Sequence, residues 1–140
     1  MSDPAPICLR ITATPVEVRA ALTGLMTRPD LTGDSDFRQR LEIVLAEILN
    51  NIAEHAYPAA PGRIGLCLSP GATGMTCQVT DYGLPMPGLA APAGHPPPMT
   101  EANLPEGGFG WFLIRSLCAG LTYRHRNGQN DLTLIVPWHQ

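Results

Sequence analysis

The clearest hydrophobic pattern of the chain lies between Phe37 and Tyr57, where apolar residues recur every three or four positions. This spacing matches the turn of an α-helix and predicts an amphipathic helix of about five to six turns. Pro58 to Gly62 ends the helix, because this stretch holds two prolines and a glycine. The predicted buried face consists of Phe37, Leu41, Val44, Leu45, Ile48, Ile52 and Ala56.

Shorter patterns predict a helix on each side of the long one, and five strands. Clusters of glycine, proline and asparagine predict turns at 70–74 and 127–130. The resulting order, β-α-α-β-β-loop-α-β-β, predicts an α+β fold with helices stacked on one face of a mixed sheet. The predicted strands are 7–14, 63–69, 75–80, 121–126 and 132–137, and the predicted flanking helices are 15–27 and 107–119.

Residues 82–106 form the longest stretch without periodicity, and they hold seven of the fifteen prolines. Proline has no backbone N–H, so this stretch offers few donors to a sheet and is predicted to be a long loop. Loops of this length inside a compact domain are usually functional or disordered.

Composition narrows the class of protein. A length of 140 residues with 44% apolar content predicts one globular domain spanning 1–140. The net charge is −3 and the nine arginines are scattered, which argues against a nucleic-acid surface and a polybasic membrane segment. No run approaches the ~18 apolar residues of a membrane helix, and no leader-like start is present, so we expect a cytoplasmic protein.

The four cysteines, Cys8, Cys67, Cys77 and Cys118, lie far apart and form no C-x-x-C pair. Three of them fall inside apolar runs. We therefore expect reduced core residues, with metal binding and disulfides as the alternatives.

On the long helix, Glu47, Asn51 and His55 follow one another at four-residue spacing. At 100° per residue they form a stripe along the border of the apolar face, while Asn50 and Glu54 project towards solvent. Of the two adjacent asparagines, Asn51 is therefore the one predicted to face a ligand.

Two readings of this stripe remain open. It can be a solvated helix edge that ends in a histidine favoured by the helix dipole. It can also be functional, because a carboxamide oxygen at Asn51 can serve Mg²⁺, which keeps its other positions for water and phosphate. Glu47, one turn away, could then accept a proton from an attacking hydroxyl group.

Two further motifs carry candidate chemistry. Asp81 ends a predicted strand and could accept a hydrogen bond from an adenine amino group, and Gly83 allows close backbone approach or positive φ. Alone, this Asp-x-Gly pattern is also typical of a simple turn. Gly107-Gly-Phe-Gly110 precedes an apolar helix, where unhindered amides can bind phosphate, or where glycines can form a flexible joint.

Taken together and in this order, the motifs give the chain a family resemblance. Ala46-Glu-Ile-Leu-Asn-Asn-Ile-Ala-Glu-His-Ala-Tyr57, Val79-Thr-Asp-Tyr-Gly-Leu-Pro85 and Glu106-Gly-Gly-Phe-Gly-Trp-Phe-Leu-Ile-Arg-Ser-Leu117 resemble the ATP-binding domain of the gyrase/histidine-kinase superfamily, known as the Bergerat fold. The resemblance extends from about residue 7 to 137. More narrowly, the chain looks like the bacterial anti-sigma-factor serine/threonine kinases. The resemblance implies a two-layer α/β sandwich with a mixed, mostly antiparallel sheet and an ATP lid at about 82–106.

The resemblance also implies roles for individual residues, with ATP and Mg²⁺ as cofactors. Asn51 would hold Mg²⁺, Glu47 would be the general base for a protein hydroxyl, and Asp81 would bind the adenine amino group. The remaining implied roles are a base pocket shaped by Gly83, a phosphate lid hinge at Gly107, Gly108 and Gly110, and a weaker adenine contact at Thr133 beside Asp81. His55 matches a frequent position but receives no chemical step.

Two departures from the family pattern stand out. Pro85 replaces a glycine that many superfamily members carry after Asp-x-Gly. Residues 82–106 contain no Lys or Arg, so no cation of the lid can neutralise charge on a transferred phosphoryl group. Either catalysis is slow, or Arg115 or a partner supplies the charge.

The resemblance predicts an anti-sigma-factor kinase that phosphorylates a STAS-type anti-sigma-factor antagonist, with a sigma factor as a second candidate partner and a homodimer as a further expectation. The alternative is a nucleotide-binding module that switches partners with little or no turnover. A histidine-kinase catalytic domain is disfavoured, because no helical hairpin with a phosphoacceptor histidine precedes the motifs.

Overall fold

One five-stranded sheet forms the base of the structure. In the computed structural model, which describes residues 5–93 and 110–140, the strand order is β1-β2-β3-β5-β4. All four pairings are antiparallel, so the α+β class is confirmed, whereas the mixed sheet is wholly antiparallel in the part described. The strands are β1 (Ile7–Thr12), β2 (Arg63–Pro70), β3 (Gly74–Asp81), β4 (Ala119–Arg126) and β5 (Gln129–Pro137).

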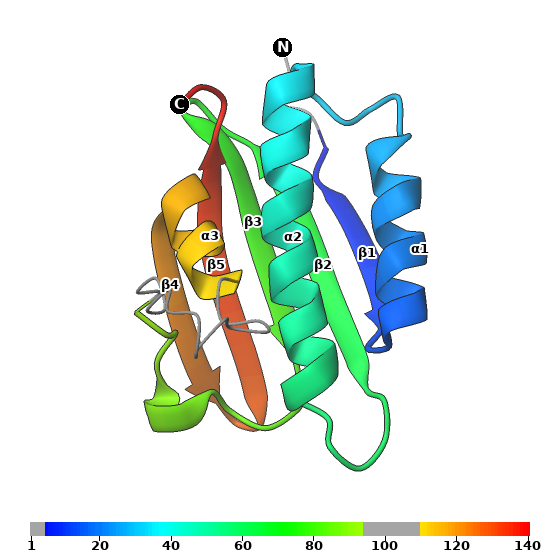
Figure 1. The fold of residues 1–140 in the computed structure, drawn as a ribbon, viewed down its shortest axis with the longest axis vertical. Coiled ribbons are helices and arrows are strands. Elements are labelled where there is room, and N and C mark those ends of the chain that lie inside the picture. Colours follow the sequence, from blue (N-terminus) through cyan, green and yellow to red (C-terminus); the bar gives the residue numbers. More distant parts are fainter. Residues whose placement is uncertain (1–4, 94–109) are drawn as a thin grey trace, which may run out of the picture.

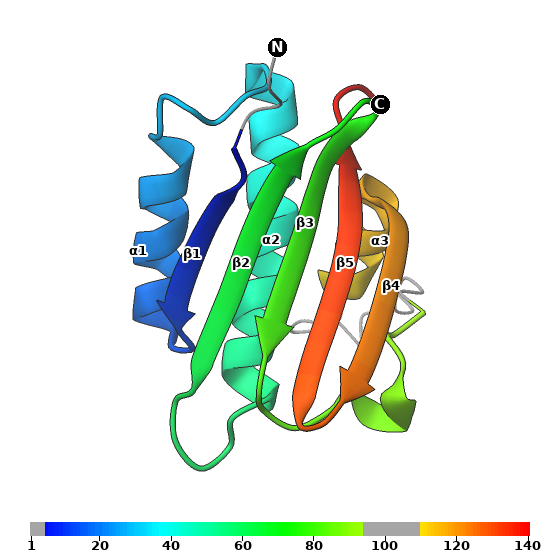
Figure 2. The ribbon, with the colours of Figure 1, turned by 180° about the vertical axis from the view of Figure 1, so that it is seen from behind.

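The helices cover one face of this sheet, as predicted. They are α1 (Pro15–Met26), α2 (Ser35–His55) and α3 (Gly110–Leu117), with a short 3-10 turn, η1 (Pro87–Leu89). Figure 1 shows α2 in front of the central strands, between α1 and α3. The view from behind shows no described helix over the opposite face (Figure 2). The fold is therefore a two-layer sandwich with one covered and one open sheet face.

Helix α2 provides most of the helical half of the core. It begins after Asp34, whose side chain accepts a hydrogen bond from the Phe37 backbone amide at 2.9 Å. Asp34 is thus the N-cap, and the helix begins two residues before Phe37, where the apolar pattern starts. The buried stripe agrees with the predicted apolar face and packs on alternate residues of the strands. It contains Phe37, Leu41, Val44, Leu45, Ile48, Leu49 and Ile52.

A buried arginine fastens the start of α2 to the end of the sheet. The Arg40 guanidinium donates hydrogen bonds to the carbonyl oxygens of Pro137 (2.7 Å) and Trp138 (2.9 Å). It also pairs with Asp36, four residues earlier on the helix, at 3.1 Å. Because a buried cation needs such partners, these bonds fix how α2 lies along β5.

The turn between β4 and β5 is tighter than predicted. Only Asn127 and Gly128 form it, both with positive φ (54° and 74°), which is the two-residue hairpin geometry that an Asn-Gly pair favours. The sequence-based interpretation treated 127–130 as the turn and began the last strand at residue 132. In the structure β5 begins at Gln129, so Asn130 is part of the sheet.

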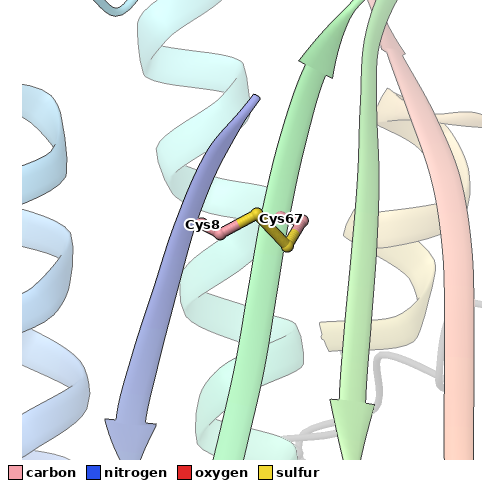
Figure 3. Close-up of a disulfide and its surroundings, with 2 residues drawn as sticks. All are labelled: Cys8 and Cys67. Atoms are coloured by element: carbon pink, nitrogen blue, oxygen red, sulfur yellow. A yellow bond between two sulfur atoms is a disulfide. The ribbon is translucent and has the colours of Figure 1, made fainter. Parts of the chain in front are cut away.

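The expectation of four reduced core cysteines is wrong for two of them. Cys8 on β1 and Cys67 on β2 are directly opposite in register and form a disulfide. Figure 3 shows the bond between these strands, with α2 behind them. Both cysteines lie on the open face, and the pairing joins residues 59 positions apart, which no local pattern could reveal. Disulfides are rare in the cytosol, so the bond weighs against the expected cytoplasmic location, which stays a prediction.

Cys77 and Cys118 remain free thiols. Cys77 is fully buried, as expected, and burial raises the pKa of its thiol to about 12. Cys118 is half-buried, and desolvation raises its pKa as well. Both thiols are therefore protonated and weakly reactive at neutral pH.

We expect the double substitution Cys8→Ser, Cys67→Ser to lower the free energy of unfolding by about 2–4 kcal/mol. The cross-link closes a loop of 59 residues and restricts the unfolded chain, which is where a disulfide has most of its effect. Urea unfolding of the oxidised protein and of the variant measures the difference. Cys118→Ala is the control, and an unchanged midpoint in the double variant would show that the bond does not form in solution.

Candidate functional site

A cavity of about 440 Å³ opens at one end of the sheet, where α2 and β3 end and β5 begins. These parts lie together with η1 at the lower end of the molecule in Figure 1. The cavity size is within the range of sites for small organic ligands, and most of its lining is apolar. The lining consists of Asn51, Ile52, His55, Ala56, Asp81, Leu84, Pro85, Met86, Pro87, Pro92, Trp111, Tyr123 and Asn130.

The helical side of the cavity is formed by residues near the end of α2. Asn51 and His55, one turn apart on α2, both line the cavity, whereas Asn50 does not. His55 is exposed and lies 3.5 Å from the Glu54 carboxylate, so it also fits the role of a solvated helix end. Asn51 is half-buried and places a carboxamide at the edge of the cavity.

On the sheet side, Asp81 is the buried acid, with 6% of its surface exposed. One of its oxygens, Oδ1, accepts hydrogen bonds from the Gly83 amide (2.9 Å) and from Asn130 Nδ2 (2.8 Å). Among the described residues both bonds fall on Oδ1, so Oδ2 is left for a ligand in the cavity. Burial raises the pKa of Asp81, and the two hydrogen bonds partly offset this because they favour the ionised form.

Thr133 does not lie beside Asp81. It pairs with Gln78 and Thr122 and points to the open face, because it alternates with the buried Leu132 and Leu134 of β5. The predicted position next to Asp81 is occupied by Asn130, which pairs with Asp81 across the β3–β5 ladder. The prediction that Thr133 lies beside Asp81 is therefore wrong, and Asn130 is the β5 residue that adjoins Asp81.

Gly83 is needed for close approach and not for positive φ. A Cβ at this position would come within 2.3 Å of the Ala56 carbonyl oxygen, at the end of α2. The neighbouring Leu84 amide donates to the same oxygen at 2.7 Å. The glycine therefore lets the chain after Asp81 pass directly against the C-terminus of α2, which closes one side of the cavity.

Glu47 lies next to the start of α3. A Cβ added to Gly110 would lie 2.6 Å from the Glu47 Oε2 atom, so the carboxylate fills the space that the glycine leaves. The N-terminus of a helix favours a negative charge. The structure thus brings Glu47 and Gly110 together one helical turn from Asn51, although Glu47 is not part of the cavity lining.

Part of the predicted lid lies outside the described residues, and so do Gly107 and Gly108. The described start of the lid contains η1 and packs over the cavity through Met86 and Pro87. Arg115, predicted as a possible source of positive charge, instead donates hydrogen bonds to the Ala91 and Pro92 carbonyls, the latter at 3.0 Å. It therefore holds the start of the lid against α3.

The described residues contain no cluster of three His, Cys, Asp or Glu side chains that could hold a metal ion. A Mg²⁺ ion here would therefore depend on the Asn51 oxygen together with phosphate and water, which suits the usual coordination of Mg²⁺. Separately, none of the helices in ranges 5–93 and 110–140 has the length and hydropathy of a membrane span.

The comparison with protein families agrees with this geometry. The family described as "Histidine kinase-like ATPase domain" matches residues 11–136, most of the chain, so the protein belongs to this family. This membership implies ATP binding. Curated proteins yield no match.

The residues of the cavity fit an adenine nucleotide. Its apolar walls suit a purine ring, the Asp81 carboxylate is an acceptor of the kind that an exocyclic amino group requires, and Asn51 carries a carboxamide oxygen on the helical wall. The bound nucleotide would supply the transferable phosphoryl group. The chain's own residues would orient the base and exclude water around it.

Three of the polar and aromatic lining residues were not predicted as site residues from the sequence. Asn130 was placed in a turn, and Tyr123 and Trp111 were treated as parts of a strand and a helix without a role. A signal for Asn130 was present: with Asn127-Gly128 as a two-residue turn, Asn130 becomes a polar residue at a buried strand position. No comparable signal exists for Trp111, because its position depends on how α3 packs.

We expect Asp81→Asn to stabilise the nucleotide-free protein near neutral pH. The raised pKa of Asp81 means that the ionised carboxylate is disfavoured by folding, and an amide removes this cost while it can still accept both hydrogen bonds. The gain in stability of the Asp81→Asn variant should be absent below pH 3.8, the ordinary pKa of an aspartate side chain. It should grow as the pH rises through the folded pKa of Asp81. Melting temperatures of both proteins between pH 4 and 8 test this, and a constant difference would contradict it.

Gly83→Ala and Gly110→Ala should have different consequences. At Gly83 the new Cβ meets a backbone oxygen that cannot move freely, so stability should fall by about 1–3 kcal/mol. At Gly110 it meets the far end of the Glu47 side chain, which can rotate away, so stability should change little while Glu47 is displaced. Urea unfolding compares the two, and equal losses would contradict the assignment.

Proposed function

We propose that this protein is an ATP-dependent serine/threonine-protein kinase of the anti-sigma-factor type, which phosphorylates a STAS-type anti-sigma-factor antagonist and regulates transcription by partner switching. The observation that carries the proposal is the joint position of Asn51 and Asp81 on the wall of one apolar cavity. Glu47, one turn before Asn51, supports phosphoryl transfer as the reaction.

The family resemblance assigns the roles, and this placement is compatible with them. Asp81 accepts the amino group of adenine, and Asn51 would provide a protein oxygen for Mg²⁺, which would offset negative charge on the phosphates. Glu47 takes the proton of a serine or threonine hydroxyl as its oxygen bonds to the γ-phosphorus and the bond to ADP breaks. The α3 N-terminus beside Glu47 adds a favourable dipole for the negative charge of the phosphates.

The second candidate is a nucleotide-binding module that switches partners with little or no turnover. Two observations favour it. Residues 82–106 contain no Lys or Arg, and the Arg115 guanidinium is bonded to the Ala91 and Pro92 carbonyls. Phosphoryl transfer depends strongly on positive charge near the transferred group, so a partner would have to supply it.

The partner predictions follow from the family resemblance and comprise the STAS-type antagonist, a sigma factor as a second partner and a homodimer. The cytoplasmic location and the lack of direct nucleic-acid or membrane contact remain expectations from the composition. The open face of the sheet and the exposed side chains of Tyr82 and Leu84 near the cavity leave surface available for a protein partner. The substrate hydroxyl would have to approach on the Glu47 side.

We expect Glu47→Gln to bind Mg·ATP with an affinity close to that of the natural chain, and to transfer phosphate to the antagonist at least about 100-fold more slowly. The amide keeps the shape of the side chain but cannot accept the proton. Transfer is measured with radiolabelled ATP and a purified STAS-type antagonist, and binding by thermal shift with and without Mg²⁺. Glu54→Gln, on the solvent side of α2, is the matched control.

The outcomes separate the candidates. Mg²⁺-dependent stabilisation by ATP without phosphate on the antagonist would favour the switching module. Transfer that persists in Glu47→Gln would remove Glu47 from the mechanism. No stabilisation by ATP, or stabilisation that survives in Asn51→Ala and Asp81→Ala, would reject the cavity as the nucleotide site.

A further inference from the structure

The side chain of Asn130 is held at both ends by hydrogen bonds to several residues. It is 4% exposed and lies at the floor of the cavity. Its Nδ2 group donates to Asp81 Oδ1 at 2.8 Å, to the Gly83 carbonyl at 3.1 Å and to the Leu84 carbonyl at 3.2 Å. One amide group therefore connects the buried acid to the first residues of the lid.

The other end of the same carboxamide is also held. The Tyr123 hydroxyl donates to Asn130 Oδ1 at 2.6 Å, and the Nδ1 atom of His125 lies 2.8 Å from the same oxygen. The Tyr123 oxygen in turn accepts a hydrogen bond from the Met86 amide at 2.9 Å. A second connection to the start of the lid therefore passes through Tyr123.

These partners fix the orientation of the carboxamide. Turned the other way, its oxygen would face three acceptors on Asp81, Gly83 and Leu84, and its amino group would face a hydroxyl already bonded to Met86. The donors and acceptors around Asn130 therefore determine which way its oxygen and its amino group face. The amino group of Asn130 and the Gly83 amide both donate to Asp81 Oδ1, which restrains the carboxylate, and among the described residues Oδ2 is the oxygen left to a ligand of the cavity.

We propose that Asn130 is the positioning residue that determines the selectivity of the site for the base. It orients Asp81 as an acceptor for the exocyclic amino group of adenine, and with Tyr123 it ties this acceptor to residues 83–86 of the lid. The inference rests on the proposed function in one respect, namely that the cavity binds adenine. The new element is Asn130, which holds the Asp81 carboxylate in the orientation that this hydrogen bond needs.

The expected effect on affinity comes from the difference between an Asp81 carboxylate that is held in position and one that is free to rotate. A hydrogen bond to an ionised group favours binding by roughly 10- to 100-fold when the group is already in position. A carboxylate that can rotate must first be ordered, and it can turn towards other donors. Loss of Asn130 should therefore weaken the recognition of the amino group more than the binding of the ring and phosphates.

The test compares ATP with purine riboside triphosphate, which lacks only the 6-amino group. The natural chain should bind ATP about 10- to 100-fold more tightly by isothermal titration. Asn130→Ala should reduce this preference by about tenfold, and Gln129→Ala, the neighbouring residue on the open face, should keep it. A merely structural role for Asn130 would lower the melting temperature and weaken both nucleotides equally, leaving their ratio unchanged.

A folded Asn130→Ala protein with the natural preference would overturn the inference. Should this variant not fold, Tyr123→Phe provides the same test, because it removes one fixed contact of Asn130 and keeps the ring. A drop of about threefold in the preference supports the inference, and an unchanged preference overturns it.

Asp81→Ala separates this inference from the proposed function. A natural chain without preference for ATP, or an Asp81→Ala variant that keeps the preference, would reject adenine recognition by Asp81, and the inference with it. A preference that is lost in Asp81→Ala but kept in Asn130→Ala would reject only the role of Asn130.

Discussion

The burial of one face of α2 against the sheet is the constraint on which the rest of the structure depends. The apolar stripe fixes the rotation of this helix, and the Arg40 bonds to Pro137 and Trp138 fix its start along β5. Glu47 and Asn51 lie at the border of the stripe, so their direction follows from the packing. A site residue at the edge of a buried face is positioned by the core without being part of it.

The antiparallel ladder supplies the opposite wall of the cavity. The β3–β5 register sets Asp81 opposite Asn130. The two-residue turn at Asn127-Gly128 sets the register of β4 against β5, which places His125 opposite Asn130. This wall of the cavity thus depends on two strand registers as well as on the acid itself.

Two further features concern the lid and the far edge of the sheet. The lid has no cation, and the described part of it is anchored through hydrogen bonds to Arg115, Tyr123 and Asn130. Those bonds favour a lid whose first turn is fixed to the walls of the cavity. The Cys8–Cys67 disulfide, on the open face, stiffens the opposite edge of the sheet and leaves the cavity untouched.

The sequence by itself determined the α+β class from the order of its elements. It also determined the bounds of α2 to within about two residues and the choice of Asn51 over Asn50. Helical periodicity is a local signal, so it can be read without the tertiary structure. The sequence also singled out Asp81, from its place at a strand end. Only the tertiary structure decided that Asn130 and not Thr133 adjoins Asp81, that Cys8 bonds Cys67, and that Glu47 lies against Gly110. Each of these pairings joins residues distant in the chain, and strand register and helix packing, which set them, leave no periodic trace in the sequence.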